Sequence, residues 1–473
     1  MKQLVLFVAL AVTTSAIAQN KPAETKYRRS SLHSIMVDDA KLPNAKVIKE
    51  AFTKQPLPDK YNDHSLASRS FAPDKYALTA AEKTALGAKT ESKAAGKMKG
   101  AAKGAAAGAT GGLVDTTDAK YLPQVIEKYL VANNVARDMV AKWFNRDAAT
   151  GAFNMNLIGE RGSYDASAMQ VNIAKGSVKG VAAIADAGVE LIGNTFVVVT
   201  RFNFVSKKEL YDAAQAALAV AAAAGGGAAA GKLKGKVPGG GSVPNVPMTP
   251  EMQAAKDAAY KKATEGHIVQ CTSYLFQLVW NDSVEAVFYN DLWMDATTAD
   301  GAKRKKAFDD SKLFTMKYIG DGKALANVPL SLKKKRSDEE LIAVATQNAS
   351  DASIAKLQRD YEVFKTKTPL FSGNPITAKI GLKEGLEAGD KFEVLEQQLD
   401  EKTGRTKYVS KGKIKVTDAI WDNRFALEGE APVEEAPALD KDGKPLPPKP
   451  VYTETTFKGG SKFYPGMLIR QIK

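Results

Sequence analysis

The sequence has little of the residues on which many sites depend. It contains one cysteine, Cys271, and three histidines, His33, His64 and His267. A single cysteine excludes an intrachain disulfide, and hence a scaffold held together by disulfides. No histidine has metal-ligand spacing to another histidine or to the cysteine, so no metal site is expected. The motifs GxSxG, Walker A, HExxH and the Rossmann fingerprint are also absent. These absences predict no cofactor and favour a non-enzymatic protein.

The first residues have the order of features typical of a secretory signal peptide. Lys2 supplies a positive charge, Leu4 to Val12 form an apolar run, and Ala16-Ile17-Ala18 places small residues at the cleavage positions. The run is shorter than the roughly 20 residues that span a bilayer, and no cysteine follows it as in a lipoprotein. We therefore expect cleavage after Ala18 and a mature protein in the periplasm or outside the cell.

The net charge of +14 is concentrated near the N-terminus. Residues 19–114 hold 17 Lys and Arg against 9 Asp and Glu, a net charge of +8. Outside the cytoplasm, such a segment is expected to meet anionic lipid head groups or acidic envelope polymers rather than nucleic acid. Since residues 19–90 show several prolines and no sustained apolar period, we expect residues 19–114 to be largely extended or disordered.

Two Ala/Gly tracts divide the chain. Glycines recur every four residues from Gly96 to Gly112, and again from Gly227 to Gly239. On a helix these glycines share one face, as in paired membrane helices, but lysines interrupt both tracts. Flexible linkers are the favoured interpretation, with the second linker covering residues 213–248. Paired helices in a membrane-active oligomer are the alternative.

The segments 115–212 and 249–367 are predicted to form an α/β core with a mixed sheet. The apolar spacing predicts a helix over about 121–144, a strand around Phe153, Met155 and Leu157, a helix to about Leu191 and a buried strand over 195–204. A hairpin is expected over 267–280 and 284–294, with its dense aromatic residues in the core, then a short strand over 314–319. Ser337 and Glu340 form a capping box for a helix to about Lys365.

From Thr368 onward the apolar period changes to two. Short runs around Ile376, Phe392, Ile414 and Ile469 alternate with turn-rich pieces, one of them at Gly412. This pattern predicts a small all-β barrel or sandwich over residues 368–473. An acidic, proline-rich excursion near 428–450 is expected to be a solvated loop. The fold class is therefore α+β or α/β, with several domains.

One polar cluster is a candidate catalytic site. Glu160, Arg161, Tyr164 and Asp165 follow the predicted strand where a helix begins, which is where α/β folds place their sites. Glu160 and Asp165 have the residue types for general acid–base chemistry. The structural alternative is an ion pair beside a turn, with Asp165 capping the next helix.

The C-terminal region resembles the small β-barrel domain at the end of flagellar assembly protein T. The resemblance lies in residues 377–381 (TAKIG), 384–394 (EGLEAGDKFEV), 412–417 (GKIKVT) and 465–467 (PGM). The α/β part is similar in element order to the curli secretion lipoprotein family, although that family's lipobox cysteine is missing here. These resemblances imply a periplasmic, envelope-associated assembly or scaffolding role, and no active site carries over.

The leading hypothesis is thus an exported, non-enzymatic protein that acts in assembly, scaffolding or binding at the cell envelope. Its expected partners are envelope proteins or anionic polymers and lipid surfaces, with an oligomer of the chain itself as a further possibility. An envelope hydrolase that uses Glu160 and Asp165 is the enzymatic alternative.

Overall fold

Strands from widely separated parts of the chain form one mixed sheet in the computed structural model. The sheet has six strands, in the order β2 (Tyr61–Asp63), β1 (Ser30–Val37), β4 (Thr195–Ser206), β5 (His267–Leu278) and β6 (Met316–Asn327), with β3 (Ser70–Phe71) paired to the end of β1. Strand β1 is parallel to β2, β3 and β4, whereas β5 and β6 are antiparallel to their neighbours. The structure describes residues 27–86, 120–164, 188–212, 266–328, 337–399, 406–423, 450–460 and 462–472, with a few helical positions between 215 and 264.

The central strand β1 corrects the prediction of an extended or disordered leader. Every residue of β1 is buried. Ile35 and Val37 join the core on one face of the sheet, and Leu32 and Met36 join the cores on the other. The sequence does not indicate this strand, because its other positions are serines and a histidine. The alternation of apolar and polar residues that is typical of a strand is therefore unclear. A helix, α1 (Ala45–Lys54), and the short strand β2 also form within this segment.

Helices and turns from three parts of the chain cover the first face of the sheet. They are α4 (Leu122–Ala132), α5 (Val135–Trp143), α6 (Asn156–Tyr164), α12 (Asp282–Val287), the π-helical turn η4 (Phe288–Leu292) and α13 (Gly301–Asp310). The helix predicted over 121–144 is broken in two, because Asn134 adopts a left-handed conformation with φ of 50°. A 3₁₀ turn, η1 (Pro73–Tyr76), packs against α4.

The strand predicted around Phe153 is wrong, and with it the expected strand–helix–strand unit. Phe153 is buried and its backbone NH donates to the oxygen of Met294, but Met155 is exposed. Asn154 then accepts a hydrogen bond from the NH of Asn156, where α6 begins. The apparent alternation is therefore a loop followed by a helix. The strand predicted over 195–204 is confirmed as β4.

The predicted hairpin is also wrong in its second half. Asn281 accepts a hydrogen bond from the NH of Val284 and so caps α12, which puts helix where the second strand was expected. The partner of β5 is instead β6, which is longer than the predicted strand over 314–319. The aromatic residues of this region do lie in or against the core, as predicted: Tyr274, Phe276, Trp280, Phe288, Tyr289 and Trp293.

The second face of the sheet is covered by α1 and by the long helix α14 (Asp338–Asp360). The capping box of Ser337 and Glu340 is confirmed, with both reciprocal hydrogen bonds formed. The helix ends at Asp360 rather than near Lys365. Cys271 of β5 is buried here, and its thiol donates to the backbone oxygen of Ala349 at 3.0 Å. Burial raises the pKa of the Cys271 thiol to about 12, so it is not a nucleophile at neutral pH.

The C-terminal part is a closed antiparallel barrel, as the change of apolar period predicted. Its strands are β7 (Thr368–Gly373), β8 (Ile376–Ala378), β9 (Lys391–Leu399), β10 (Thr406–Val416), β11 (Thr455–Gly459) and β12 (Leu468–Ile472), in the order β10-β11-β8-β7-β12-β9. Gly412 is not in a turn but lies within β10, next to a bulge. The expected α+β fold with a small barrel is confirmed.

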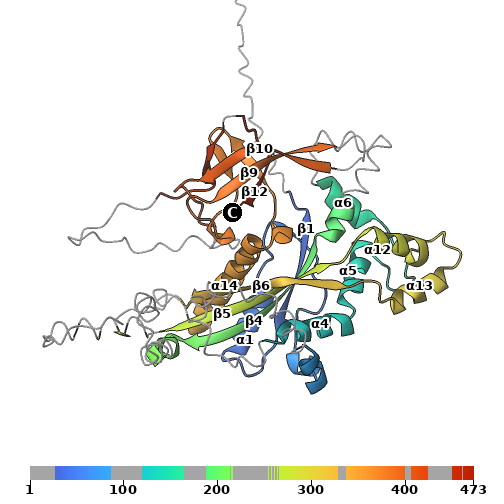
Figure 1. The fold of residues 1–473 in the computed structure, drawn as a ribbon, viewed down its shortest axis with the longest axis horizontal. Helices are drawn as coiled ribbons and strands as arrows, with labels where there is room; N and C mark the ends of the chain where they lie inside the picture. Colours follow the sequence, from blue (N-terminus) through green and yellow to red (C-terminus); the bar gives the residue numbers. More distant parts are fainter. Residues whose placement is uncertain are drawn as a thin grey trace, which may run out of the picture.

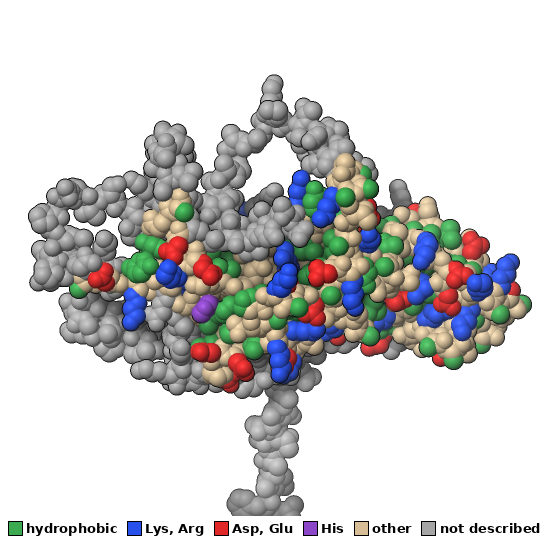
Figure 2. All heavy atoms as spheres, turned by 90° about the horizontal axis from the view of Figure 1, so that it is seen from below, with side chains coloured by type: hydrophobic (Ala, Val, Ile, Leu, Met, Phe, Trp, Pro, Cys, Tyr) green, Lys and Arg blue, Asp and Glu red, His purple; other side chains and the backbone are tan. Residues whose placement is uncertain are grey.

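The barrel contacts α14 through the 3₁₀ turn η7 (Leu382–Glu384) and lies at one end of the sheet, near the start of β1 (Figure 1). A second 3₁₀ turn, η6 (Glu362–Phe364), contacts this helix from the connector. Arg359 of α14 donates to the backbone oxygen of Gly385. On the face shown in Figure 2, basic and acidic side chains of the described residues are interspersed rather than gathered into one patch.

Several predictions fall outside the described residues. These are the signal peptide, both glycine tracts and the acidic excursion from 424 to 449. Among the helices that the structure describes, none is both long and apolar enough to span a bilayer.

Candidate functional site

Arg161, one of the predicted site residues, anchors α6 to the sheet. Its guanidinium donates to the backbone oxygen of Asp63 at 2.6 Å and to Ser31 Oγ at 3.3 Å. It also lies 3.1 Å from Nδ1 of His64 and 4.7 Å from the centroid of the Trp143 ring. These contacts hold the guanidinium from several sides, which supports a structural role for Arg161.

His64 is fully buried, and both of its ring nitrogens have partners. Nε2 lies 2.9 Å from the backbone oxygen of Met139, which can only accept, so Nε2 carries the proton. Nδ1 is then the acceptor for Arg161. Burial lowers the pKa of His64 to about 3, and repulsion from Arg161 adds to the shift. The ring is therefore neutral at pH 7 and completes a structural network, not an acid–base pair.

Among the other candidate residues, Glu160 acts on Arg161 through its charge, which favours the charged guanidinium and opposes the pKa decrease caused by burial. Glu160 is exposed on α6, and Tyr164 is the last residue of that helix. Asp165 lies outside the described residues, so the pairing of Glu160 with Asp165 stays a prediction. His33 is buried in β1, and His267 opens β5 as the sequence predicted, with its ring stacked on Phe204.

A cavity of about 170 Å³ lies where the barrel meets the sheet. The sheet contributes the amino ends of its parallel strands: Ser30 begins β1, Lys60 precedes β2 and Asn194 precedes β4. The barrel contributes Arg470 of β12, and the connecting segment 362–367 forms the remaining wall. At about 30 Å³ per water molecule, the cavity has room for roughly six waters, which suits a small group better than a large cofactor.

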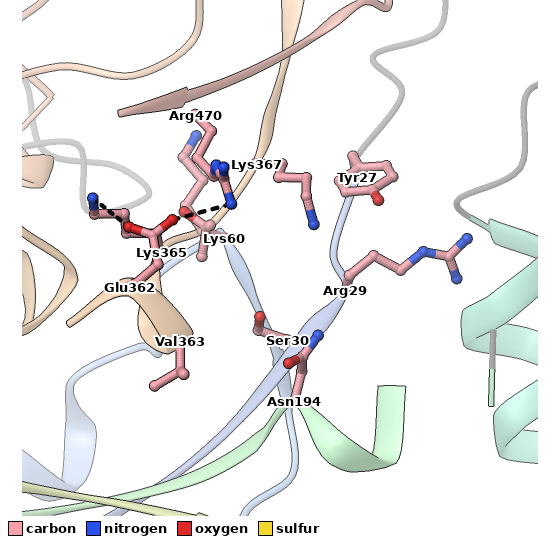
Figure 3. A pocket seen from close by; sticks show the side chains of 11 residues that line it. Tyr27, Arg29, Ser30, Lys60, Asn194, Glu362, Val363, Lys365, Lys367 and Arg470 are labelled. Atoms are coloured by element: carbon pink, nitrogen blue, oxygen red, sulfur yellow. Dashed lines mark ion pairs between the residues drawn. The ribbon is translucent and has the colours of Figure 1, made fainter. Parts of the chain in front are cut away.

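The wall of this junction pocket is strongly basic. One carboxylate, Glu362, lines it beside five basic side chains: Arg29, Lys60, Lys365, Lys367 and Arg470. Figure 3 shows Lys60, Lys365 and Arg470 near Glu362 on one side, Arg29, Tyr27 and Lys367 on another, and Ser30 beside Asn194. Counting Glu190 and Glu393, which pair with these cations from behind the wall, five basic groups face three carboxylates, so the surroundings of the cavity keep a net positive charge.

Carboxylates orient two sides of the wall. Glu362 pairs with Lys365 at 2.7 Å and with Arg470 at 3.1 Å, the two ion pairs drawn in Figure 3. Glu393 of β9 pairs with the same guanidinium and accepts from its Nε at 2.7 Å. Arg470 is thus held between two carboxylates, which fixes the direction of its remaining donors before a ligand binds.

Glu190 holds the opposite side of the wall. It lies 3.5 Å from Nζ of Lys367 and 3.8 Å from Nε of Arg29. The hydroxyl of Tyr408, on β10, donates to Glu190 at 3.1 Å. Tyr408 therefore accepts from the hydroxyl of Tyr27, which lies 2.5 Å away. This network joins the barrel to the sheet and positions Arg29 and Lys367 at the pocket.

Burial within this network shifts the pKa values of Lys367 and Tyr27. It lowers the pKa of Lys367, and Glu190 partly opposes that shift. Burial also raises the pKa of Tyr27, as does the nearby charge of Glu190. The lowered pKa means that Glu190 offsets only part of the cost of burying the charged ammonium group of Lys367. An additional anion in the pocket would favour its charged form.

The residue types of the pocket suit an anion and not a metal ion. Ammonium and guanidinium groups donate hydrogen bonds and cannot act as metal ligands while charged. Within the described ranges, no group of three or more His, Cys, Asp or Glu is placed to hold a metal. The pocket can therefore bind and orient a carboxylate or a phosphoryl group.

The sequence did not reveal this site, for two reasons. Arg29 and Lys60 belong to the segment interpreted as a solvated leader, and Lys365 was placed at the end of a helix. Moreover, sites in α/β folds usually lie at the carboxyl ends of the strands. The junction pocket lies at the amino ends of the parallel strands instead.

Comparison with protein-family models and with curated proteins finds no match to this chain.

Proposed function

We propose that the protein is an exported, non-enzymatic envelope protein that binds an anionic group in the junction pocket and acts as a scaffold. The observation that carries the proposal is the pocket wall, where five basic side chains converge from the sheet, the connector and the barrel. Pre-positioned cations in a partly enclosed cavity favour an anionic ligand without supplying a nucleophile or a general base.

The attachment of the barrel to the sheet supports the scaffolding part of the proposal. The Glu190 network and the contacts of α14 with η7 hold the two parts together. A ligand in the pocket would touch both parts and reinforce this arrangement. The hydrolase and the membrane-active oligomer depend on Asp165 and on the glycine tracts, which lie outside the described residues, so the geometry favours neither.

Calorimetric titration of the mature protein with inorganic phosphate and with cyclohexanecarboxylate at low ionic strength tests anion binding. We expect both anions to bind, and Lys60→Gln and Lys365→Gln each to weaken binding about tenfold or more. A hydrogen bond to a charged group contributes about 1.5–3 kcal/mol, and each 1.4 kcal/mol is a factor of ten. The matched control is Lys306→Gln on α13, whose side chain is 80% exposed and pairs with Asp310.

The control should bind both anions like the wild type. Absence of binding by the wild type, or equal binding by Lys60→Gln and Lys306→Gln, would contradict the proposal. Cell fractionation tests export separately, and a chain that stays uncleaved in the cytoplasm would refute that part.

A further inference from the structure

We infer that the junction pocket binds an acidic sugar, that is, a hydroxylated ring that carries one carboxylate or phosphate group. This inference rests on the proposed anion binding and adds the chemical class of the ligand. It comes from the uneven distribution of polar groups in the pocket wall, which has a basic part and an uncharged part.

The uncharged part of the wall consists of Ser30 and Asn194. The parallel register of β1 and β4 pairs Ser31 with Thr195, so the residues before them are neighbours, as Figure 3 shows. Ser30 is 7% exposed, yet neither its hydroxyl nor the Asn194 amide has a hydrogen-bond partner within the part of the chain that the structure describes.

Ser30 is buried and Asn194 is half-buried, and both line the cavity, so a ligand or water there can pair with their polar groups. A serine hydroxyl can donate and accept, and an asparagine amide offers two donors and one acceptor. Sugar hydroxyls also donate and accept, and they match both side chains. A carboxylate or a doubly ionised phosphate ester satisfies the donors but offers nothing to the acceptors, because its ionised oxygens carry no proton.

The basic part of the wall lies apart from this pair in Figure 3 and contains Lys60, Lys365 and Arg470. It is the place for the charged group of the ligand. Val363 lines the wall and provides an apolar surface for the C–H groups of a ring. Since the cavity is partly open to solvent, a sugar at the end of a longer glycan can enter it.

Titration of the full mature protein with two matched pairs of ligands tests the inference. The carboxylate pair is glucuronate and cyclohexanecarboxylate, and the phosphate pair is glucose 6-phosphate and cyclohexylmethyl phosphate. Within each pair the charged group is the same, and the ligands differ mainly in the hydroxyls of the ring. We expect the hydroxylated member of at least one pair to bind about tenfold more tightly, and that pair identifies the anionic group.

The double variant Ser30→Ala/Asn194→Ala should lose this preference and retain the affinity for the ligands without hydroxyls. Its thermal unfolding shows whether it folds, and the wild-type comparison decides the question even if it does not. Equal affinities within both pairs would overturn the acidic-sugar inference and leave anion binding intact. Failure of all four ligands to bind would overturn both proposals.

Discussion

The hydroxyl groups of Tyr27 and Tyr408 share a hydrogen bond of 2.5 Å, although the two residues are 381 positions apart in the chain. Tyr27 lies just before the central strand of the sheet, and Tyr408 lies on β10 of the barrel. Because the Tyr408 hydroxyl donates a hydrogen bond to Glu190, the two tyrosines and the carboxylate form one directed chain of hydrogen bonds. This chain fastens the barrel to the sheet beside the junction pocket.

Replacing Tyr408 with Phe should therefore destabilise the protein. The substitution keeps the ring over which Lys367 lies but leaves the O–H donor of Tyr27 without its acceptor and removes the hydrogen bond to Glu190. An unsatisfied buried polar group costs about 1–3 kcal/mol, so we expect a loss of that size in the free energy of unfolding. Urea unfolding followed by tryptophan fluorescence measures it.

Tyr464→Phe is the matched control for this prediction. Its hydroxyl donates to Glu396 at 2.7 Å, but the residue is 50% exposed, so water can replace the lost partner. The control should change the free energy of unfolding by less than about 0.5 kcal/mol. Equal stability of the Tyr408→Phe and Tyr464→Phe variants would show that the directed chain does not hold the barrel.

Acidification should destabilise the sheet through its two buried histidines. Burial lowers the pKa values of His33 and His64 to about 3, against an ordinary value of 6.5. The unfolded chain binds protons below pH 6.5 and the folded chain does not, so stability is complete above pH 6.5 and is lost as the pH falls toward 3. Each histidine contributes a slope of up to about 1.4 kcal/mol per pH unit.

Urea unfolding at several values between pH 7 and pH 5 tests this slope. His64→Gln should be less stable than the wild type at pH 7 but should depend less on pH. His267→Gln, at an exposed position, should keep the wild-type dependence. If the His64→Gln and wild-type curves run parallel, the buried ring is not the source of the acid sensitivity.

Asp351 of α14 should oppose the histidines over part of the same range. Burial raises its pKa to about 6, although Lys383 counteracts the shift. Between pH 3.8 and 6 the folded chain therefore binds the proton more tightly than the unfolded chain, and stability falls as the pH rises. Above pH 6 the charged carboxylate of Asp351 costs the folded protein stability, by an amount that no longer changes with pH.

Asp351→Asn should remove that cost and keep the hydrogen bond that Gln55 donates at 2.9 Å. Because Asp351 is only partly shielded from solvent, we expect a gain of about 1 kcal/mol at pH 7 and little change at pH 4. Thermal unfolding at the two pH values measures the difference. A gain of the same size at both values would assign it to packing and not to charge.

The sequence predicted elements whose signals are local and missed those that tertiary contacts define. The capping box at Ser337, the buried strand β4 and the alternating barrel strands follow from short-range patterns, and the structure confirms them. Strand β1 is rich in serine and is buried only because neighbours on both sides pair with it. Burial that depends on neighbouring strands cannot be predicted from the local sequence.

The junction pocket was not predicted because it, too, depends on tertiary contacts. Ser30, Lys60, Asn194 and Arg470 come from four parts of the chain, and only the strand order and the docking of the barrel bring them together. A single sequence shows each of them as an ordinary polar residue. The candidate residue Arg161 shows the converse, since its position beside two acids suggested catalysis whereas its contacts fix α6 in place.

Gly381, where β8 leads into η7, should tolerate no side chain. A Cβ atom at this position would lie 2.1 Å from the backbone oxygen of Trp421, which also accepts a hydrogen bond from the NH of Leu382. The two backbone segments, which meet here in an isolated bridge, would have to move apart, so Gly381→Ala should destabilise the barrel by about 3 kcal/mol. Thermal unfolding of the variant measures this loss.

Gly159→Ala is the opposite case and serves as the control. Gly159 lies within α6, and a Cβ atom there meets nothing within 4 Å. Alanine restricts the unfolded chain and favours the helix, so this variant should gain about 0.5–1 kcal/mol. The substitution of alanine is thus expected to destabilise the protein at Gly381 and to stabilise it at Gly159. A Gly381→Ala variant as stable as Gly159→Ala would mean that the barrel does not close tightly against Trp421.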